Sequence, residues 1–273
     1  ALSPLFNASQ SNFLGSDNVL RGQFTPGVGV EYRYPLFARL NIGTVTFEPI
    51  MQIVARPNVI GSNSLVNIDA QSLVFDDTNL FSWNKFSGYD RFETGVRANY
   101  GAQFTLNLNN GGFVNVMAGQ SYQLAGTNSY ATPDAANVGL SSGLDTRRSD
   151  YVGRIAFAPA SFLSFVAKAR FDQANMHLRR LDLVAGATFG PLTTTIQYAN
   201  YSAQPLLGFD VRRQGLSLGA RYDITKNYFV NGNVQFDMSR YLYNNTAAIN
   251  GVGGYAPVMS IAGLGLGAGY QDD

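Results

Sequence analysis

The segment RFETGVRANYGAQFTLN, Arg91–Asn107, decides the fold class of the chain. Its side chains alternate along the backbone between an apolar and a polar set. The apolar set is Phe92, Val96, Ala98, Tyr100, Ala102, Phe104 and Leu106, and the polar set is Arg91, Glu93, Arg97, Asn99, Gln103 and Thr105. Phe162–Asp172 and Tyr228–Arg240 repeat the pattern. Because successive side chains of a strand point to opposite faces, the alternation predicts strands with one face in an apolar medium and the other in water.

The length of these segments favours a membrane barrel over a soluble β-sandwich, whose strands also alternate. Strands of soluble sheets typically run about 5–6 residues. The segments in this chain run about 10–13 residues, close to the length of a tilted strand that crosses a bilayer. Aromatic residues near the segment ends, such as Tyr151, Phe189 and Tyr228, are typical of the aromatic girdles of such barrels. The sequence therefore predicts an all-β fold, an antiparallel transmembrane β-barrel.

The composition narrows the classes of function. Of the 273 residues, 14% are charged, whereas soluble domains average about 25%. The net charge of +1 gives no electrostatic reason to expect nucleic acid as a partner. The chain has no Cys, which excludes disulfides, thiol catalysis and thiolate metal sites within it. No apolar run approaches the roughly 18–20 residues of a transmembrane helix, so contact with lipid would require a closed barrel.

The connections between the predicted strands alternate between short and long, as in outer-membrane barrels with short periplasmic turns and long external loops. The short turns fall near Pro35–Ile42, Leu108–Gly111, Pro159–Ala160, Gly190–Pro191 and Thr225–Asn227. The long connections fall near Arg56–Asp90, Gly126–Ser149, Ser202–Val211 and Tyr241–Ala256. We expect Ala1–Gly22 to be a loop that enters the first strand. The count of about eleven strands is odd, so residues 1–273 are expected to be a portion of a larger outer-membrane β-barrel domain.

The longest of these connections contains the segment FDDTNLFSWNKFSGYDR, Phe75–Arg91. It holds the only Trp of the chain, Trp83, and an adjacent pair of acids. The segment resembles the signature of the lipopolysaccharide-assembly protein family of the Gram-negative outer membrane (LptD), in the C-terminal half of its barrel. The residues that match the signature are Asp76, Asp77, Asn79, Leu80, Phe81, Asn84, Phe86, Ser87, Gly88, Asp90 and Arg91.

The resemblance implies a very wide barrel of about 26 strands that translocates lipopolysaccharide and catalyses no covalent chemistry. In that family the lipid enters the outer leaflet of the cell outer membrane through the barrel lumen and a lateral opening. The implied partners are lipopolysaccharide, outer-membrane lipids, a plug lipoprotein (LptE), and a periplasmic lipopolysaccharide-bridge protein that would bind a domain expected to lie outside this sequence. The alternative is a general diffusion porin or another outer-membrane channel, which would share the strands, the girdles and the wet lumen.

The polar faces of the predicted strands carry candidates for the lining of the lumen: Glu93, Arg97, Arg154, Lys168, Arg170 and Arg221. These charges would either keep the interior of a wide barrel hydrated or line a path for an amphiphile with an anionic head group. Phe75–Arg91 has two possible roles. It either packs as an inward-folded loop, or it gates or shapes the lumen. The single histidine, His177, lies in a short connection without a nucleophile motif beside it. The sequence therefore predicts no enzyme, no catalytic residue, no metal site and no cofactor.

Overall fold

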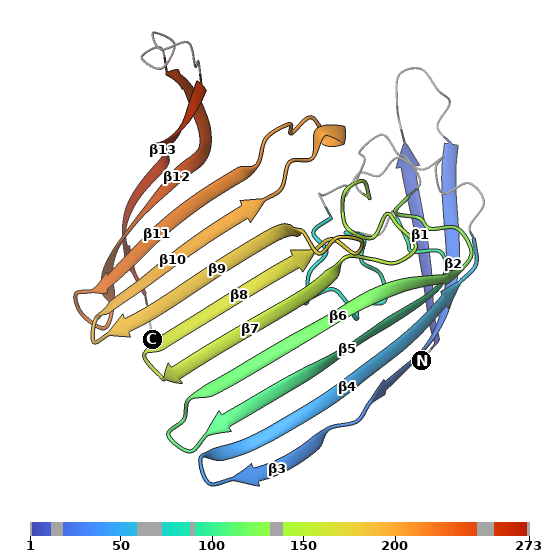
Figure 1. The fold of residues 1–273 in the computed structure, drawn as a ribbon, viewed down its shortest axis with the longest axis horizontal. Coiled ribbons are helices and arrows are strands. Elements are labelled where there is room, and N and C mark those ends of the chain that lie inside the picture. Colours follow the sequence, from blue (N-terminus) through green and yellow to red (C-terminus); the bar gives the residue numbers. More distant parts are fainter. Residues whose placement is uncertain are drawn as a thin grey trace.

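The computed structural model describes the chain apart from residues 1, 12–18, 59–72, 88–90, 132–138, 245–253 and 272–273. Its strands form one antiparallel sheet that follows the order of the sequence (Figure 1). The first six strands are β1 (Leu2–Ser11), β2 (Val19–Arg33), β3 (Leu36–Leu40), β4 (Gly43–Arg56), β5 (Gly95–Leu108) and β6 (Phe113–Ala125). The others are β7 (Tyr151–Ala160), β8 (Leu163–Phe171), β9 (Leu178–Phe189), β10 (Leu192–Tyr201), β11 (Arg213–Asp223), β12 (Tyr228–Asn244) and β13 (Gly254–Tyr270). The predicted all-β, antiparallel fold class is confirmed.

β2 and β3 are two parts of one interrupted strand, and both pair with β4. The second half of β2 pairs with the second half of β4, and β3 pairs with its first half. Pro35 lies in the gap, and proline has no backbone N–H to donate to the neighbouring strand. The Tyr34 N–H still donates to the Pro49 carbonyl at 3.3 Å. The interruption therefore breaks the hydrogen-bond ladder without detaching the strand from β4.

The expectation that Ala1–Gly22 is a loop was wrong. Leu2–Ser11 forms β1, which pairs with β2 along its whole length. Pro4 and Pro26 lie opposite each other in this ladder, and proline usually argues against a strand unless the strand lies at an edge. β1 does lie at one end of the strand order. The described residues therefore give the sheet thirteen strand segments, or twelve strands when β2 and β3 are counted as one, where about eleven were expected.

Short turns join the strands at one end of the sheet, and the long connections leave from the other end (Figure 1). This arrangement agrees with the alternation of short and long connections in the sequence. Two turns are displaced from their expected places: the turn expected near Pro35–Ile42 is confined to 41–42, and the turn expected at Pro159–Ala160 lies at 161–162. Within the described residues, no helix has the length and apolar character of a membrane span.

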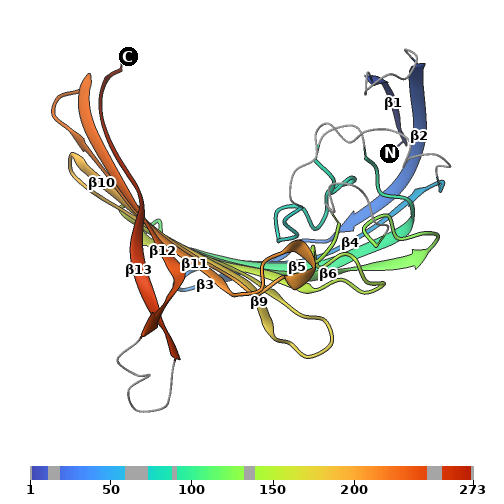
Figure 2. The same cartoon turned by 90° about the horizontal axis from the view of Figure 1, so that it is seen from above.

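The sheet is curved (Figure 2), and its convex face is apolar. Large hydrophobic side chains on many of its strands remain exposed, among them Tyr100, Ile155, Leu183, Ile196 and Leu264. Leu264 of β13 is 73% exposed. Soluble monomers rarely expose contiguous apolar patches larger than a few hundred Å². The convex face is therefore suited to contact with lipid.

Described parts of two long connections lie on the concave side of the sheet, against its polar face (Figure 2). We call these parts, residues 73–87, 91–94, 126–131 and 139–150, the inner layer. Because they are irregular in structure, their position depends on side-chain contacts with the strands beneath them. The inner layer therefore adds a second layer of protein to part of the concave face.

An apolar core lies between the inner layer and the sheet. Phe86 stacks on Tyr130 with ring centroids 4.4 Å apart. Each fully buried side chain of this size stabilises the docked layer by roughly 1.5–3 kcal/mol. The core consists of Phe75, Leu80, Phe86, Tyr130 and Leu144 from the inner layer together with Met117 of β6 and Val152 of β7.

Candidate functional site

The start of the signature segment, residues 75–80, forms a turn that its own side chains hold. The Asp76 N–H donates to Asn79 Oδ1 at 3.0 Å, and the Thr78 N–H donates to Asp76 Oδ1 at 2.8 Å. The Asn79 amide in turn donates to a preceding backbone carbonyl at 2.7 Å. Asp and Asn suit such turns because their short side chains reach nearby backbone groups. The local sequence therefore fixes the shape of this turn before any contact with the sheet.

The acid pair of the signature contacts two neighbouring strands. Asp77 Oδ2 lies 3.3 Å from Arg154 Nη1 of β7, and Asp77 Oδ1 lies 3.4 Å from Lys168 Nζ of β8. Lys168 Nζ also lies 3.3 Å from Asp76 Oδ2. Arg154 and Lys168 are opposite each other in the ladder, so their charges lie side by side. The Asp77 side chain is 1% exposed, whereas those of Arg154 and Lys168 are 29% and 26% exposed, so these ion pairs are partly buried contacts between the inner layer and the sheet.

The end of the signature segment is held by a buried ion cluster around Glu93. The Glu93 carboxylate lies 3.2 Å from Lys85 Nζ and 3.2 Å from Arg97 Nε, and it accepts the Lys85 N–H at 2.8 Å. The side chain of Lys85 is completely buried, and that of Arg97 is 3% exposed. The Arg97 guanidinium also lies over the ring of Tyr130, 5.2 Å from its centroid. One carboxylate thus joins a cation of the inner layer to a cation of β5.

Glu93 and Asp76 stay ionised although burial opposes their ionisation. Burial would raise the pKa of Glu93, but the neighbouring Lys85 and Arg97 hold it below its usual range. Burial also opposes ionisation of Asp76, whereas hydrogen bonds from Thr78 and a nearby lysine lower the pKa of that carboxyl. Burial lowers the pKa of Lys85, and Glu93 opposes that shift. At neutral pH the carboxylates of Glu93 and Asp76 are therefore charged.

Asn84 connects the signature segment by hydrogen bonds to the residues that precede β5. Its Nδ2 donates to the carbonyl of Arg91 at 2.9 Å, and its Oδ1 accepts the Glu93 N–H at 3.1 Å. The carbonyl of Phe81 accepts a hydrogen bond from Gln52 Nε2 of β4 at 2.8 Å. These bonds satisfy backbone groups that an irregular segment would otherwise leave unpaired.

The remaining signature residues differ in burial. Arg91 is buried and Ser87 is partly buried. Gly88 and Asp90 lie outside the described residues. The roles of these four residues stay predictions.

A row of polar side chains crosses four strands beneath the inner layer, and the sequence analysis missed it as a unit. Glu31, Gln52, Asn99 and Ser121 occupy opposed positions on β2, β4, β5 and β6. Gln52 Nε2 donates to Glu31 Oε2 at 2.7 Å, and Asn99 Nδ2 donates to Gln52 Oε1 at 2.7 Å. The Ser121 hydroxyl donates to Asn99 Oδ1 at 2.6 Å. Alternation predicts that Asn99 faces the polar side, but only the strand register brings the four residues together.

Two opposed glycines allow the inner layer to approach the sheet closely. Gly101 of β5 and Gly119 of β6 are register partners. A Cβ atom at Gly119 would lie 2.4 Å from Leu80 Cδ2 and 2.6 Å from the Tyr100 carbonyl oxygen. Leu80 is fully buried, so its place in the core depends on the absence of a side chain at position 119.

We expect Gly119→Ala to loosen the inner layer. The added methyl group must displace Leu80, and such overpacking typically costs about 1–3 kcal/mol. Hydrogen exchange of the amides in 73–87, measured on the full-length protein in detergent, should become faster. Gly219→Ala is the matched control, because the nearest atom to a Cβ at that strand glycine lies at 4.0 Å. Equal protection of 73–87 in the two variants would contradict the close contact.

Arg170 of β8 fastens the other loop of the inner layer. Its Nη1 and Nη2 donate to the carbonyls of Ser142 and Ser141, and its Nε lies 3.3 Å from Asp150 Oδ2. Burial raises the pKa of Asp150 from the usual 3.8 to about 6, although Arg170 and the Gln173 N–H act in the opposite direction. The Asp150 carboxyl therefore gains its proton in mildly acidic solution.

The loop 139–150 should be more stable at pH 5 than at pH 7. The folded-state pKa of Asp150, about 6, exceeds the usual 3.8, so the folded loop binds the proton more tightly than the unfolded loop. The resulting stabilisation is full below pH 3.8 and is lost as the pH rises through about 6. Hydrogen exchange at 142–150, corrected for its intrinsic pH dependence, should slow at pH 5. The same pH dependence in Asp150→Asn would assign the effect to another group.

Arg221 lies away from the inner layer, near the short-turn end of β11. Its Nε lies 2.8 Å from Asp223 Oδ1, and its guanidinium lies 3.6 Å from the centroid of the Phe229 ring. The two side chains of this ion pair are 39% and 43% exposed.

His177 is exposed between β8 and β9. Across the described residues, no group of three His, Asp or Glu side chains is arranged to hold a metal ion.

Comparison with known proteins gives one family and several distant structures. The family described as LptD, LPS transport system D, matches residues 8–228. Two mutants of Rh. blastica porin align over 86% of this chain and 94% of their own, with 9% and 10% identity and TM-scores of 0.28 and 0.29. A structure described as "Asymmetric conductivity of engineered proteins" has the same coverage, 10% identity and a TM-score of 0.29. No curated protein matches the chain.

Proposed function

Because the chain belongs to the LPS transport system D (LptD) family, we propose that it forms part of the barrel wall through which lipopolysaccharide reaches the outer leaflet. The chain is an outer-membrane β-barrel protein of a transport family. In this proposal its residues catalyse no covalent reaction. They provide an apolar surface for the bilayer, a polar wall for the cargo, and an inner layer that shapes the space between them.

The observation that carries the proposal is the docking of the inner layer by buried charges. The side chains of Asp77, Lys85, Glu93 and Arg97 are at most 7% exposed. Charged side chains select solutes in a channel when they line the water-filled pore. These four charges instead hold the signature segment against the sheet. The arrangement favours a shaped and partly filled lumen over an open, charge-selective diffusion pore.

The two faces of the sheet suit an amphiphilic cargo. The convex face is apolar and the concave face is polar, so lipid and water can contact the same strands from opposite sides. An anionic head group would move along the concave face, where its charge remains hydrated. The acyl chains would leave sideways into the bilayer through a lateral opening, because a polar lumen does not stabilise them.

We also infer two protein partners from membership of the family. A plug lipoprotein (LptE) would occupy the concave side beside β9–β13, where Arg221 and Asp223 are partly exposed. A periplasmic lipopolysaccharide-bridge protein would deliver the lipid from the short-turn end of the barrel. Both partners would contact surfaces that the inner layer leaves uncovered.

Shutting off expression of the full-length gene in its own host tests the proposed function. Newly made lipopolysaccharide, detected by pulse labelling, should stop reaching the cell surface and should accumulate inside. Re-expression of the gene should restore surface arrival, and assembly of an unrelated barrel protein serves as the control for general envelope damage. Unchanged surface lipopolysaccharide together with reduced uptake of small solutes would contradict the proposal and indicate a diffusion pore.

A further inference from the structure

One lateral row of positions crosses the concave face from beneath the inner layer toward the later strands. Val152 of β7 lies opposite Arg170 of β8, and Arg170 lies opposite Arg180 of β9. Arg180 lies opposite Tyr201 of β10, and Tyr201 lies opposite Arg213 of β11. Like charges that face each other directly across two strands are destabilising. Arg170 and Arg180 face each other in this way, and Arg213 follows beyond Tyr201, so a bound anion would offset the repulsion within the row.

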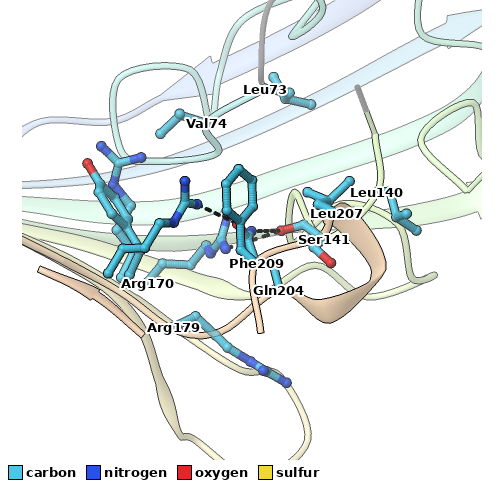
Figure 3. A pocket seen from close by; sticks show the side chains of 12 residues that line it. Leu73, Val74, Leu140, Ser141, Arg170, Arg179, Gln204, Leu207 and Phe209 are labelled. Atoms are coloured by element: carbon cyan, nitrogen blue, oxygen red, sulfur yellow. Dashed lines mark hydrogen bonds between the residues drawn. The ribbon is translucent and has the colours of Figure 1, made fainter. Parts of the chain in front are cut away.

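The three arginines line a cavity of about 380 Å³ (Figure 3). The cavity lies between the row, the inner layer and the connection from β10 to β11, and Leu140 and Leu207 add apolar surface to it. In Figure 3, Gln204 and Phe209 lie among the other lining side chains, whereas Arg179 extends away from them. Arg179 pairs instead with Asp172. The cavity thus combines a cationic wall with apolar surface.

Among the described residues, acids pair with two of the three arginines of the row and leave the third without one. Arg180 pairs with Asp182, and Arg170 pairs with Asp150. Of the carboxylates that the structure describes, none forms an ion pair with Arg213, whose Nη2 donates to a side-chain amide oxygen at 2.9 Å. The Arg213 Nε is buried, and no hydrogen-bond acceptor in the described part of the chain reaches it. One positive charge and one donor of the row are therefore available for a ligand.

Aromatic rings hold two of the guanidinium groups in place. Arg213 lies 3.7 Å from the centroid of the Phe209 ring, and Arg180 lies 4.5 Å from that of Tyr201. Stacking on a ring face fixes the guanidinium plane and leaves its edge N–H groups free to donate. A planar fork of donors matches pairs of phosphate oxygens. The cavity is accordingly built for an oxyanion with several acceptor oxygens.

We propose that Arg180 and Arg213, with Arg170 beside them as a further positive charge, form an anion site that binds a phosphate group on the head of an amphiphile. The phosphate would offset the repulsion along the row, and the adjoining part of the ligand would contact Leu140 and Leu207. This inference rests on the proposed function and deepens it, because it assigns the place where the cargo's phosphate is held. Free phosphate offers the same charge without an apolar part, so the experiment separates the two sources.

Site-specific crosslinking measures binding at this cavity alone. A photo-crosslinking amino acid replaces Leu207 in the full-length protein, which is purified with its partners and titrated with diphosphoryl lipid A. The lipid concentration at half-saturation should rise about tenfold or more in Arg213→Gln, because one charged hydrogen-bonding group is lost. Arg212→Gln is the matched control: Arg212 is the exposed neighbour, and its loss should leave half-saturation unchanged.

A second variant separates binding from a structural role. Arg213→Lys retains the charge and loses the planar fork, so its half-saturation should lie between those of the wild type and Arg213→Gln. Both variants are compared only when they are folded barrels, which is checked by the change in their gel migration on heating. Dephosphorylated lipid A should crosslink about tenfold less efficiently than the diphosphoryl form. Wild-type half-saturation in both variants, or equal crosslinking of the dephosphorylated lipid, would overturn the site.

Two further outcomes are informative about the ligand and about the function. Inorganic phosphate that competes as effectively as the lipid would overturn the assignment to an amphiphile. Crosslinking that depends on Arg213, in a protein whose shut-off leaves surface lipopolysaccharide unchanged, would support the site and contradict the proposed function. Arrested lipopolysaccharide export without such crosslinking would overturn the site and support the function.

Discussion

Replacing Glu93 with alanine should detach the inner layer from the sheet. The change leaves Lys85 and Arg97 side by side without a counter-charge, and both side chains are almost completely buried. Removal of one partner from a buried ion pair typically costs about 3–5 kcal/mol, because the remaining charge stays desolvated. The Lys85 N–H also loses its acceptor. This cost is similar to the contribution of one or two buried core side chains, at roughly 1.5–3 kcal/mol each.

Limited proteolysis of the full-length protein measures this effect. New cleavage should appear within 73–87 in Glu93→Ala, while the barrel itself keeps its heat-modifiable mobility. Asp223→Ala is the matched control, because its partner Arg221 is 39% exposed, and pairs at the surface contribute only about 0–1 kcal/mol. If Glu93→Ala resists the protease as well as Asp223→Ala does, the Glu93 cluster does not hold the inner layer.

Reversing the charge of Asp77 should release the inner layer at its other ion cluster. Asp77→Lys introduces a cation beside Arg154 and Lys168, at a position where the native side chain is 1% exposed. Buried like charges repel strongly because little water screens them. Asp76 still contacts Lys168 at 3.3 Å, but one carboxylate cannot balance the cations around it. The turn at 75–80 should therefore leave the sheet, and Leu80 should lose its place in the core.

A compensating change distinguishes charge repulsion from general damage. Arg154→Asp in the Asp77→Lys background restores opposite charges across the same contact, so part of the hydrogen-exchange protection at 73–87 should return. Arg154→Asp alone should lose protection, because it places a third carboxylate beside Asp76 and Asp77. Asp210→Lys, at an exposed acid, is the control for the added lysine. Protection losses that simply add in the double variant would contradict a direct charge contact.

The alternation of side chains was enough to predict most strands, but it could not locate the start of β5. The sequence pattern runs unbroken from Arg91, whereas β5 begins at Gly95, which has a φ of 80°. Glu93 continues the alternation of apolar and polar residues in the sequence, but in the structure Asn84 and Lys85 bind it as part of the inner layer. A side-chain period reports which residues meet water or lipid, and it does not distinguish a strand from a segment that a neighbouring loop binds.

The candidate site was predictable as a block of residues but not as a set of contacts. The signature identified Asp76 and Asp77, and the polar faces separately identified Arg154 and Lys168. Lys168 follows Asp76 by 92 residues, so no local pattern connects them. Of the charges expected to line the lumen, Arg154 and Lys168 contact the inner layer, because the strand register places them side by side beneath the acid pair.

The inner layer also makes the wall of the barrel unequal in stiffness. Its bonds connect it to β4, β5, β7 and β8, so the wall there is two layers of protein thick. β12 and β13 lie toward the opposite edge of the sheet from it (Figure 2), where the described residues form a single layer. Packed protein transmits strain and compresses little, so a double wall resists bending far more than a single one. Lateral pressure from the bilayer, or a bulky head group in the lumen, would therefore deform the thin side while the doubled side keeps its shape.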